Sequence, residues 1–485
     1  MNVTSEQNGT GGGLVRFGKR VLLRSGPPCE EGPTPIAFVT LGCPKNQVDS
    51  EVMLGHLDRA GFRTTGDLAT ARVAVVNTCA FLESAIEESI DSILEVAAHK
   101  RTGRLEKLVV AGCLTERFGR RLLDELPEVD AVMGTGDLDR VVQVIGGLLQ
   151  GGKGLRATAD DLDRPGGDAS VRVLSTGRVS PYLKISEGCS AKCTFCIIPS
   201  LRGPGRSRPI DDLVAEARRL AAGGARELVL IAQDLTAYGI DRFGEPRLDR
   251  LLRALDGVDG IRWIRLMYAN PFHWTEALID AVAGCAKVVP YADLPIQHIT
   301  DPMLRRMGRH TDRAAVTGLI RTLRERIPGI ALRTNIIAGF PGETEEDVRE
   351  LLEFLEEVRF DKLVAFPYSA EEGTAAVRLG NRVPEEAIRE RVDRILTLQG
   401  GISLSVNREQ VGRTLEVLIE KDGRPARGRS VREAPEVDGA VRVAGTALTP
   451  GEFYSVRITG ADAYDLVGVP AAPESATHEP VELTP

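Results

Sequence analysis

The sequence predicts an α/β protein with three folded domains: an N-terminal open parallel α/β domain, a partial (β/α)6 barrel and a small C-terminal antiparallel β-barrel. Apolar strands alternate with amphipathic helices over residues 34–150 and again over 179–400, which is the pattern of parallel sheets. Short strands separated by turn residues follow over 401–470, as in small closed barrels. A chain of 485 residues is also too long for one compact core.

Three segments rich in Gly, Pro and polar residues carry no strand or helix pattern. We expect residues 1–33 and 471–485 to be disordered tails and residues 151–178 to be a linker. Cys29 lies in the first tail, and we expect it to be a free thiol without a role.

In the N-terminal domain, each of three apolar strands is followed at once by a cysteine. Strands predicted at IAFVT, VAVVNT and KLVVAG lead to Cys43, Cys79 and Cys113, and helices are expected at 83–98 and 116–126. The carboxyl ends of parallel strands converge at one edge of a sheet, so we expect the three thiols to meet there. Buried core cysteines are the alternative, but three in equivalent positions favour an iron–sulfur cluster.

A second group of cysteines, Cys189, Cys193 and Cys196, has the spacing C-x3-C-x2-C and follows the predicted strand YLKIS. Three thiolates on one loop can hold three irons of a [4Fe–4S] cluster and leave the fourth iron free to chelate a small molecule. A zinc knuckle is the alternative, but it needs a fourth ligand nearby. The next histidine downstream is His273.

Six strands alternate with helices in the predicted barrel. The strands are YLKIS, ELVLIAQ, RWIRLMY, KVVPYAD, IALRTNIIAGF and KLVAFPY, and helices are expected at 211–222, 275–284, 313–326 and 344–358. Sites in parallel barrels lie at the carboxyl ends of the strands, where the cysteine loop is predicted to be.

The C-x3-C-x2-C motif resembles the signature of the radical S-adenosylmethionine (SAM) enzymes. A three-cysteine domain, this barrel and a TRAM-like barrel, in that order, resemble the methylthiotransferases over residues 35–470. The resemblance implies two [4Fe–4S] clusters and SAM as cofactors. The cluster that cleaves SAM would lie on Cys189, Cys193 and Cys196, and a second, sulfur-presenting cluster would lie on Cys43, Cys79 and Cys113.

The resemblance also implies contacts with SAM from Phe195, Gln297, Arg333 and Gly339. Arg333 would bind the SAM carboxylate as a bidentate partner. Its alternative, weighed equally, is a buried arginine paired with an acidic residue of the barrel. No catalytic residue is assigned beyond the cluster ligands.

Two branches of the family compete, one that modifies an adenosine of tRNA and one that modifies an aspartate of ribosomal protein S-twelve. The stretches YLKISEGC, CTFCIIPSLRG, AQDLTAYG and DLPIQH resemble the ribosomal-protein branch. Residues 401–470 carry nine basic and ten acidic residues and the whole chain has a net charge of −8, which disfavours a broad nucleic-acid surface. We therefore predict methylthio insertion at the β-carbon of that aspartate. Modification of tRNA, or a non-catalytic iron–sulfur or zinc protein, stays the alternative.

The predicted partners are ribosomal protein S-twelve, an electron donor such as flavodoxin or ferredoxin, and a sulfur donor. No apolar run reaches transmembrane length, and the N-terminus lacks the layout of a signal peptide. Eight cysteines in so long a chain do not make a disulfide framework. We expect a cytoplasmic protein with no membrane partner.

Overall fold

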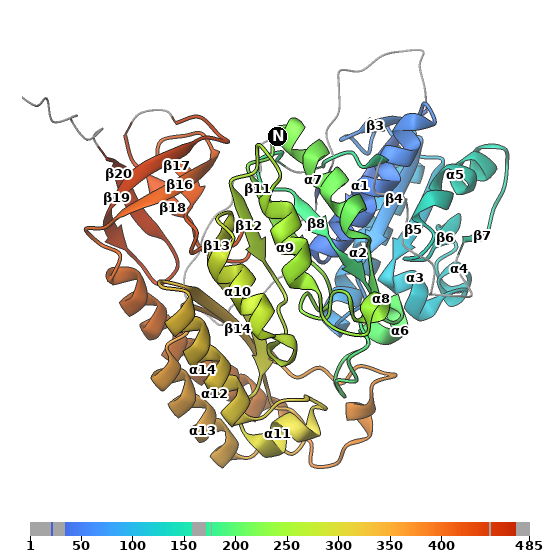
Figure 1. Cartoon of the computed structure of the whole chain (residues 1–485). Coiled ribbons are helices and arrows are strands. Elements are labelled where there is room, and N and C mark those ends of the chain that lie inside the picture. Colours follow the sequence, from blue (N-terminus) through green and yellow to red (C-terminus); the bar gives the residue numbers. More distant parts are fainter. Residues whose placement is uncertain (1–20, 23–33, 158–170, 176, 446–447, 472–485) are drawn as a thin grey trace, which may run out of the picture.

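The computed structural model describes residues 21–22, 34–157, 171–175, 177–445 and 448–471. In Figure 1 the N-terminal domain lies at the right, the half-barrel in the centre and the C-terminal barrel at the upper left. Cys29 and most of the predicted tails and linker lie outside the described residues.

The N-terminal domain is built on a sheet with the order β1-β2-β4-β5-β6-β7, in which β3 also pairs with β2. Strand β1 runs antiparallel and the others run parallel. The strands are β1 (Val21–Leu22), β2 (Pro35–Thr40), β3 (Arg63–Thr65), β4 (Val73–Thr78), β5 (Lys107–Gly112), β6 (Ala131–Met133) and β7 (Leu155–Ala157). Four of them lie where we predicted no strand: β3 and β6 inside the N-terminal domain, β1 within the tail 1–33 and β7 within the linker 151–178.

Helices cover both faces of this sheet. On one face lie α1 (Pro44–Arg59), η1 (Leu138–Arg140) and α5 (Val141–Leu149); on the other lie α2 (Glu83–Thr102), α3 (Cys113–Phe118) and α4 (Arg121–Glu125). The single helix predicted at 116–126 is wrong. Helix α3 already begins at Cys113, and the chain breaks at Gly119, whose φ of 52° lies in the left-handed region that favours glycine.

The central domain is the predicted partial barrel of six parallel strands. Their order follows the chain, from β8 (Tyr182–Lys184) through β11 (Glu227–Ile231), β12 (Trp263–Leu266), β13 (Val288–Gln297) and β14 (Ala331–Ala338) to β15 (Lys362–Pro367). The longer helices are α7 (Ile210–Ala222), α9 (Leu248–Asp256), α10 (Glu276–Gly284), α12 (Arg313–Arg326), α13 (Glu345–Val358) and α14 (Glu385–Arg408).

Short elements occupy the loops of the half-barrel. They are β9 (Ser186–Glu187), α6 (Ile198–Arg202), β10 (Arg206–Ser207), α8 (Ile240–Phe243), η3 (Pro271–His273), α11 (Asp301–Arg306) and η4 (Ala375–Arg378). Strands β9 and β10 pair as an antiparallel ribbon whose two strands flank the cysteine loop and α6.

The concave side of the half-barrel is filled by the N-terminal domain. Successive strand residues alternate between two cores: Leu228 and Leu230 pack with the outer helices, whereas Val229 and Ile231 share a core with Val52 of α1. This shared core also contains Leu418 of the C-terminal barrel, among other residues. One apolar core therefore runs through all three domains.

The C-terminal domain is a closed barrel with the order β16-β17-β18-β20-β19. Its strands are β16 (Thr414–Lys421), β17 (Ala426–Arg429), β18 (Val441–Val443), β19 (Phe453–Ala461) and β20 (Leu466–Pro470). The prediction of an antiparallel barrel holds except for one pair, because β18 and β20 run parallel.

The C-terminal barrel docks at the amino ends of β11 and β12, away from the cysteine loop. The ring of Phe453 packs edge-on against Trp263 with centroids 4.9 Å apart. Glu227 lies between two guanidinium groups, with Oε1 2.7 Å from Arg265 and Oε2 2.5 Å from Arg429. Among the described residues, no helix has the length and apolar character needed to span a membrane.

Candidate functional site

The three N-terminal cysteines lie at one edge of the sheet, as predicted. Cys43 immediately precedes α1, Cys79 follows β4 and Cys113 begins α3 directly after β5. The turn before Cys43 needs Gly42, whose φ is +87°. A Cβ atom added there would lie 2.7 Å from the Cβ and 3.1 Å from the Sγ of Cys79, so the two turns touch.

Of the three thiols, Cys79 and Cys113 are buried and Cys43 is half-buried, and a cation lies beside them. Burial raises the pKa of Cys113 to about 11, while the Arg202 guanidinium acts in the opposite direction. Burial raises the pKa of Cys79 further, and the thiols of Cys113 and Cys43 add to the rise. Such thiols become thiolates when a cation or a metal stabilises them, so this group is suited to metal ligation.

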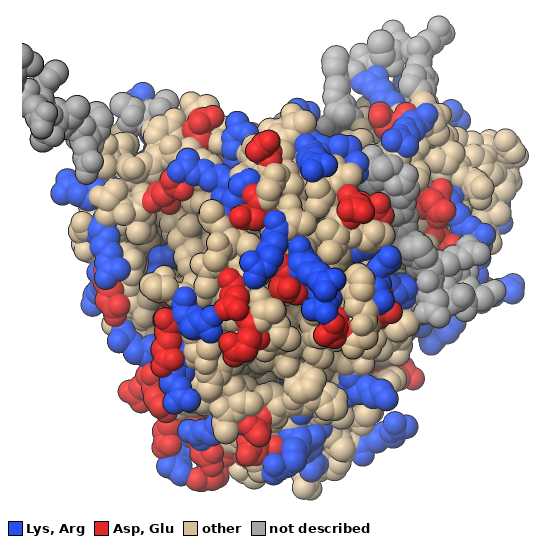
Figure 2. All heavy atoms as spheres, viewed as in Figure 1, with Lys and Arg blue, Asp and Glu red and all other residues tan. Residues whose placement is uncertain are grey.

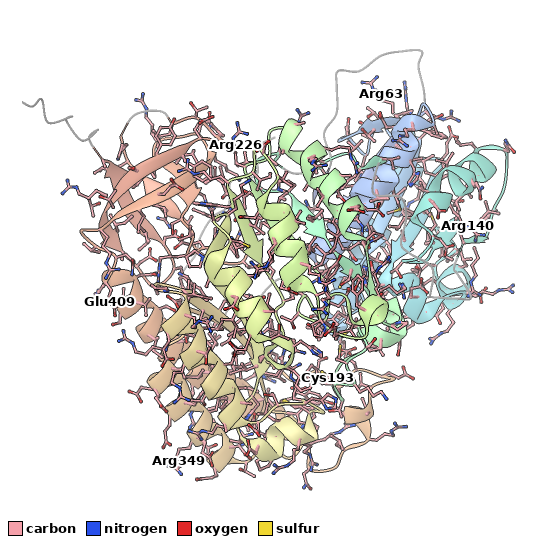
Figure 3. All side chains as sticks on the ribbon, viewed as in Figure 1. Arg63, Arg140, Cys193, Arg226, Arg349 and Glu409 are labelled. Carbon is pink, nitrogen blue, oxygen red and sulfur yellow. The ribbon has the colours of Figure 1, made fainter. Side chains whose placement is uncertain are left out.

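The second group lies on the loop between β9 and α6, at the lower end of the half-barrel where Figure 3 labels Cys193. Thr194 fixes the loop, because its N–H donates to the carbonyl of Met307 at 2.9 Å. Arg309 donates to the Sγ of Cys193 at 3.5 Å. Burial raises the pKa of Cys189 to about 11 and that of Cys196 to about 12.

A cavity of about 310 Å³ adjoins this loop. Its wall includes Cys189 and Cys193. It also includes Asp234 and Asn270, which follow β11 and β12, and Arg309. A small polar molecule could therefore reach the first two cysteines of the loop.

A buried network of charges joins the two cysteine groups. Arg202, at the end of α6, donates to Glu187 Oε1 at 2.8 Å and to Asp49 Oδ2 at 3.0 Å, and its positive charge favours the thiolate of Cys113. Lys184 completes the network through Asp49 and Glu187. We call Asp49, Lys184, Glu187 and Arg202 the interdomain network. It connects the N-terminal cysteines with the strand that leads into Cys189.

Arg333, predicted to bind SAM, is paired within the protein. Its guanidinium donates to Asp293 Oδ1 at 2.8 Å and to Asn335 Oδ1 at 3.1 Å, and it lies 3.4 Å from Asp438 of the C-terminal barrel. This is the pairing that the sequence left as the alternative. A contact between Arg333 and SAM stays a prediction.

The other three predicted SAM residues lie near the carboxyl ends of the barrel strands. Gln297 ends β13 with a φ of 71°, and Gly339 follows β14 with a φ of 80°. Phe195 packs edge-on against Phe340, with ring centroids 6.5 Å apart. None of the three lines the cavity beside Cys189, and their roles also stay predictions.

Sequence reasoning missed Lys45, which lies in the interface between the N-terminal domain and the half-barrel, here called the seam. Its side chain is buried, and its Nζ lies 2.9 Å from the centroid of the Tyr268 ring. Burial lowers the pKa of Lys45 to about 8, and Cys43 opposes this shift. The sequence does show that Lys45 directly follows the Cys43-Pro44 turn, which could have marked it as a site residue. It does not show that Tyr268 of the half-barrel is its partner.

The donor atoms fit iron–sulfur clusters better than single metal ions. In the described part of the chain, no three His, Cys, Asp or Glu side chains are placed to hold one ion. A cubane cluster instead spreads its three thiolates over three irons. The six cysteines are free thiols, and Arg202 and Arg309 supply positive charge beside them.

Family models match all three domains. Residues 35–134 match the uncharacterized protein family UPF0004, residues 183–355 the radical SAM superfamily and residues 411–470 the TRAM domain. A solved radical SAM methyltransferase, TsrM from Kitasatospora setae with cobalamin and a [4Fe–4S] cluster bound, shares the fold with a TM-score of 0.51 and 15% identity, over 70% of this chain and 75% of that one. Fold and cysteine loop together define a radical SAM enzyme.

Curated relatives narrow this class to a family. The ribosomal protein uS12 methylthiotransferase RimO of Heliobacterium modesticaldum is 49% identical over 89% of this chain and 94% of its own length. The protein of the same name from Anaeromyxobacter sp. (strain K) is 49% identical over 93% of this chain and 97% of its own. The chain belongs to the RimO family of radical SAM methylthiotransferases, and its cofactors are two [4Fe–4S] clusters and SAM, as predicted.

Proposed function

We propose that this chain inserts a methylthio group at the β-carbon of an aspartate in ribosomal protein uS12. Support comes from the name of its curated relatives, which match it over almost their whole length. One structural observation carries the proposal: Arg202 bonds to Asp49 in the helix that follows Cys43 and to Glu187, two residues before Cys189, and its charge acts on Cys113. Two cluster sites on one seam can act on one substrate.

We assign the six cysteines as cluster ligands. Cys189, Cys193 and Cys196 would hold the cluster that binds SAM, and Cys43, Cys79 and Cys113 would hold the second. When bound, the first cluster and SAM supply a radical that can remove a non-acidic hydrogen, a step that no side chain could perform as a base.

The chain's own side chains prepare these sites. Arg202 and Arg309 offer positive charge to the sulfur ligands, which favours thiolates over thiols. Ile197 and Leu201 of the α6 region pack into the core of the N-terminal domain and shield the seam from water. The interdomain network holds α1 against β8 and so fixes the distance between the two sites.

The remaining partners follow from this activity. The reaction requires an electron donor, for which we propose a flavodoxin or ferredoxin, and a sulfur donor. We propose a cytoplasmic location, where ribosomes are made. On the face shown in Figure 2, basic and acidic side chains are intermingled, which suits a protein substrate better than a nucleic acid.

Mass spectrometry of ribosomal proteins tests the proposal directly. In a strain that lacks the gene, uS12 should lose the mass of one methylthio group, and its return should require the gene. The tRNA of the same strains is the control. Loss of methylthio-adenosine from tRNA with uS12 unchanged would contradict the assignment.

Iron content tests the cofactor sites separately. Anaerobic reconstitution should give about eight irons per chain, because each cubane holds about four. Reduced protein should then convert SAM to 5′-deoxyadenosine. Zinc at either site without SAM cleavage would support a non-catalytic protein instead.

A further inference from the structure

We infer that Lys45 binds the side-chain carboxylate of the substrate aspartate and thereby selects aspartate as the residue to be modified. The inference rests on the proposed function. It begins from a buried cation to which the described structure gives no hydrogen bond and no ion pair.

Lys45 is 6% exposed, yet within the described residues its Nζ has no hydrogen bond or ion pair. The charged neighbours of Lys45 are Cys43, which we assign as a cluster ligand, and groups that are engaged elsewhere. Glu187 pairs with Arg202 and Lys184. Asp293 pairs with Arg333 and accepts the N–H of Tyr268. The other buried cations of this region are paired, so Lys45 is the one whose charge is available to a ligand.

The contact between Lys45 and Tyr268 orients this charge. The ammonium lies over the ring face of Tyr268, at a distance expected for a cation–π contact. Tyr268 has a φ of 62°, which is unfavourable for a large side chain, and two hydrogen bonds hold it there, to Asp293 Oδ2 at 2.9 Å and from the N–H of Leu235 at 2.9 Å. Such strain is concentrated at functional sites.

The side chain of Lys45 keeps 6% of its surface exposed, so it is buried without being fully enclosed. Lys45 stands two positions after Cys43 and packs against the barrel residue Tyr268, so it lies on the seam to which both cysteine groups belong. A ligand of Lys45 would therefore lie close to the proposed cluster site of Cys43, at the interface between the N-terminal domain and the half-barrel.

The chemistry of the substrate matches this position. An aspartate that enters a buried seam brings a charge whose desolvation costs several kcal/mol unless a cation pairs with it. Its carboxylate is bonded directly to the β-carbon that receives sulfur. A cation that fixes the carboxylate oxygens thus also fixes the reacting carbon, and an asparagine amide would leave the ammonium unpaired.

Substitution at both ends of this contact tests the inference. The reconstituted full-length enzyme would be assayed on uS12 carrying either aspartate or asparagine at the modified position. We expect the wild-type enzyme to favour aspartate by roughly 10- to 100-fold in kcat/KM, the range expected for a charge-assisted hydrogen bond. In Lys45→Gln the ratio should fall to near one, whereas Lys45→Arg should keep part of it. Lys421→Gln, at an exposed lysine of β16, is the matched control and should keep the full ratio.

The ratio of the two substrates is independent of the fraction of enzyme that carries both clusters, so partial loss of iron does not mask the result. If Lys45→Gln is inactive, the same ratio is obtained from the Kd values of the two uS12 proteins. An unchanged ratio in Lys45→Gln overturns the inference, and so does a loss of SAM affinity as large as the loss of discrimination. If the wild-type enzyme modifies neither protein, the proposed function itself fails.

Discussion

Arg202 is buried to 1% exposure, donates hydrogen bonds to Asn46, Asp49 and Glu187, and acts electrostatically on Cys113. Three of these partners belong to the N-terminal domain, although Arg202 belongs to the segment after the barrel's cysteine loop. The guanidinium therefore combines two tasks, neutralising buried carboxylates and placing positive charge beside a proposed cluster ligand.

Arg202→Gln should destabilise the chain by about 3–5 kcal/mol, because removing one member of a buried ion pair leaves the others uncompensated. Urea unfolding of the protein without iron measures this loss. Arg218→Gln, at an exposed arginine of α7, is the control and should stay within about 0.5 kcal/mol of wild type. Equal stability of the two variants would show that the network contributes little.

Removing single cysteines should separate the two proposed sites. Cys193→Ala should abolish SAM cleavage, since a ligand of the SAM-binding cluster is lost. Cys79→Ala should leave SAM cleavage intact and stop methylthio insertion. Both variants would be assayed for 5′-deoxyadenosine and for modified uS12. Equal loss of both products in Cys79→Ala would mean that the two sites cannot be separated.

At the residue scale, the sequence was informative where function depends on local spacing. The cysteines were found because each follows a strand or lies in a tight motif, and these features are local. Lys45 was not found, and the partners of Arg202 could not be named, because these partners come from another domain and no periodicity indicates how domains dock. Arg333 was found, but its partners Asp293 and Asp438 come from the neighbouring strand and from the C-terminal barrel, and the local sequence does not indicate them.

At the scale of elements, the turn between β2 and α1 brings Cys43 to Cys79, and its geometry depends on Gly42. The φ of 87° and the 2.7 Å approach to Cys79 leave no room for a side chain. Gly61 has a similar φ of 81°, but no atom lies within 4 Å of the Cβ that it would gain. Substitution of either glycine therefore has the same backbone cost, but only a side chain at position 42 would clash with Cys79.

Gly42→Ala should lose the iron of the N-terminal site and retain the iron of the other site. Gly61→Ala should lower the free energy of unfolding by only about 1–2 kcal/mol, the cost of a left-handed backbone conformation, and keep the iron of both sites. Iron content per chain, with electron paramagnetic resonance of the reduced protein, distinguishes the two sites. Full iron content in Gly42→Ala would show that the turn can adapt.

The strands and long helices were predicted well because their apolar periodicity is strong. Helix α12 has the predicted bounds Arg313–Arg326, and α7, α10 and α13 differ by one residue. The break at Gly119 was missed because a single glycine inside a helical pattern does not by itself end a helix. Strand β7 was missed because it is short and takes its stability from pairing with β6.

At the scale of the whole molecule, Glu227 connects the half-barrel to the C-terminal barrel. Although burial opposes it, the guanidinium groups of Arg429 and Arg265 lower the pKa of Glu227 to about 2. A carboxylate whose pKa is lower in the folded chain stabilises folding above its ordinary pKa near 4.5. That stabilisation is lost as the pH falls from about 4.5 toward 2.

The free energy of unfolding should therefore fall by about 3 kcal/mol over this pH interval from Glu227 alone. Comparing wild type with Glu227→Gln isolates this part, because the amide does not titrate. Urea unfolding at pH 5 and pH 3 provides the measurement. The variant should be less stable at pH 5 and show a smaller change with pH. The same change in both proteins would assign the acid sensitivity to other carboxylates.

The single apolar core that runs through all three domains has a consequence for building chimaeras from this chain. Leu418 and Ala434 of the C-terminal barrel domain belong to the same core as Val52 and Ile231. A foreign barrel joined at residue 410 would have to reproduce that apolar surface and the ion pair of Arg429 with Glu227. Otherwise the apolar residues at the amino ends of the half-barrel strands would be exposed to water. Replacing the C-terminal barrel to change the substrate therefore requires redesign of the interface between the barrels, and a suitable linker alone is not enough.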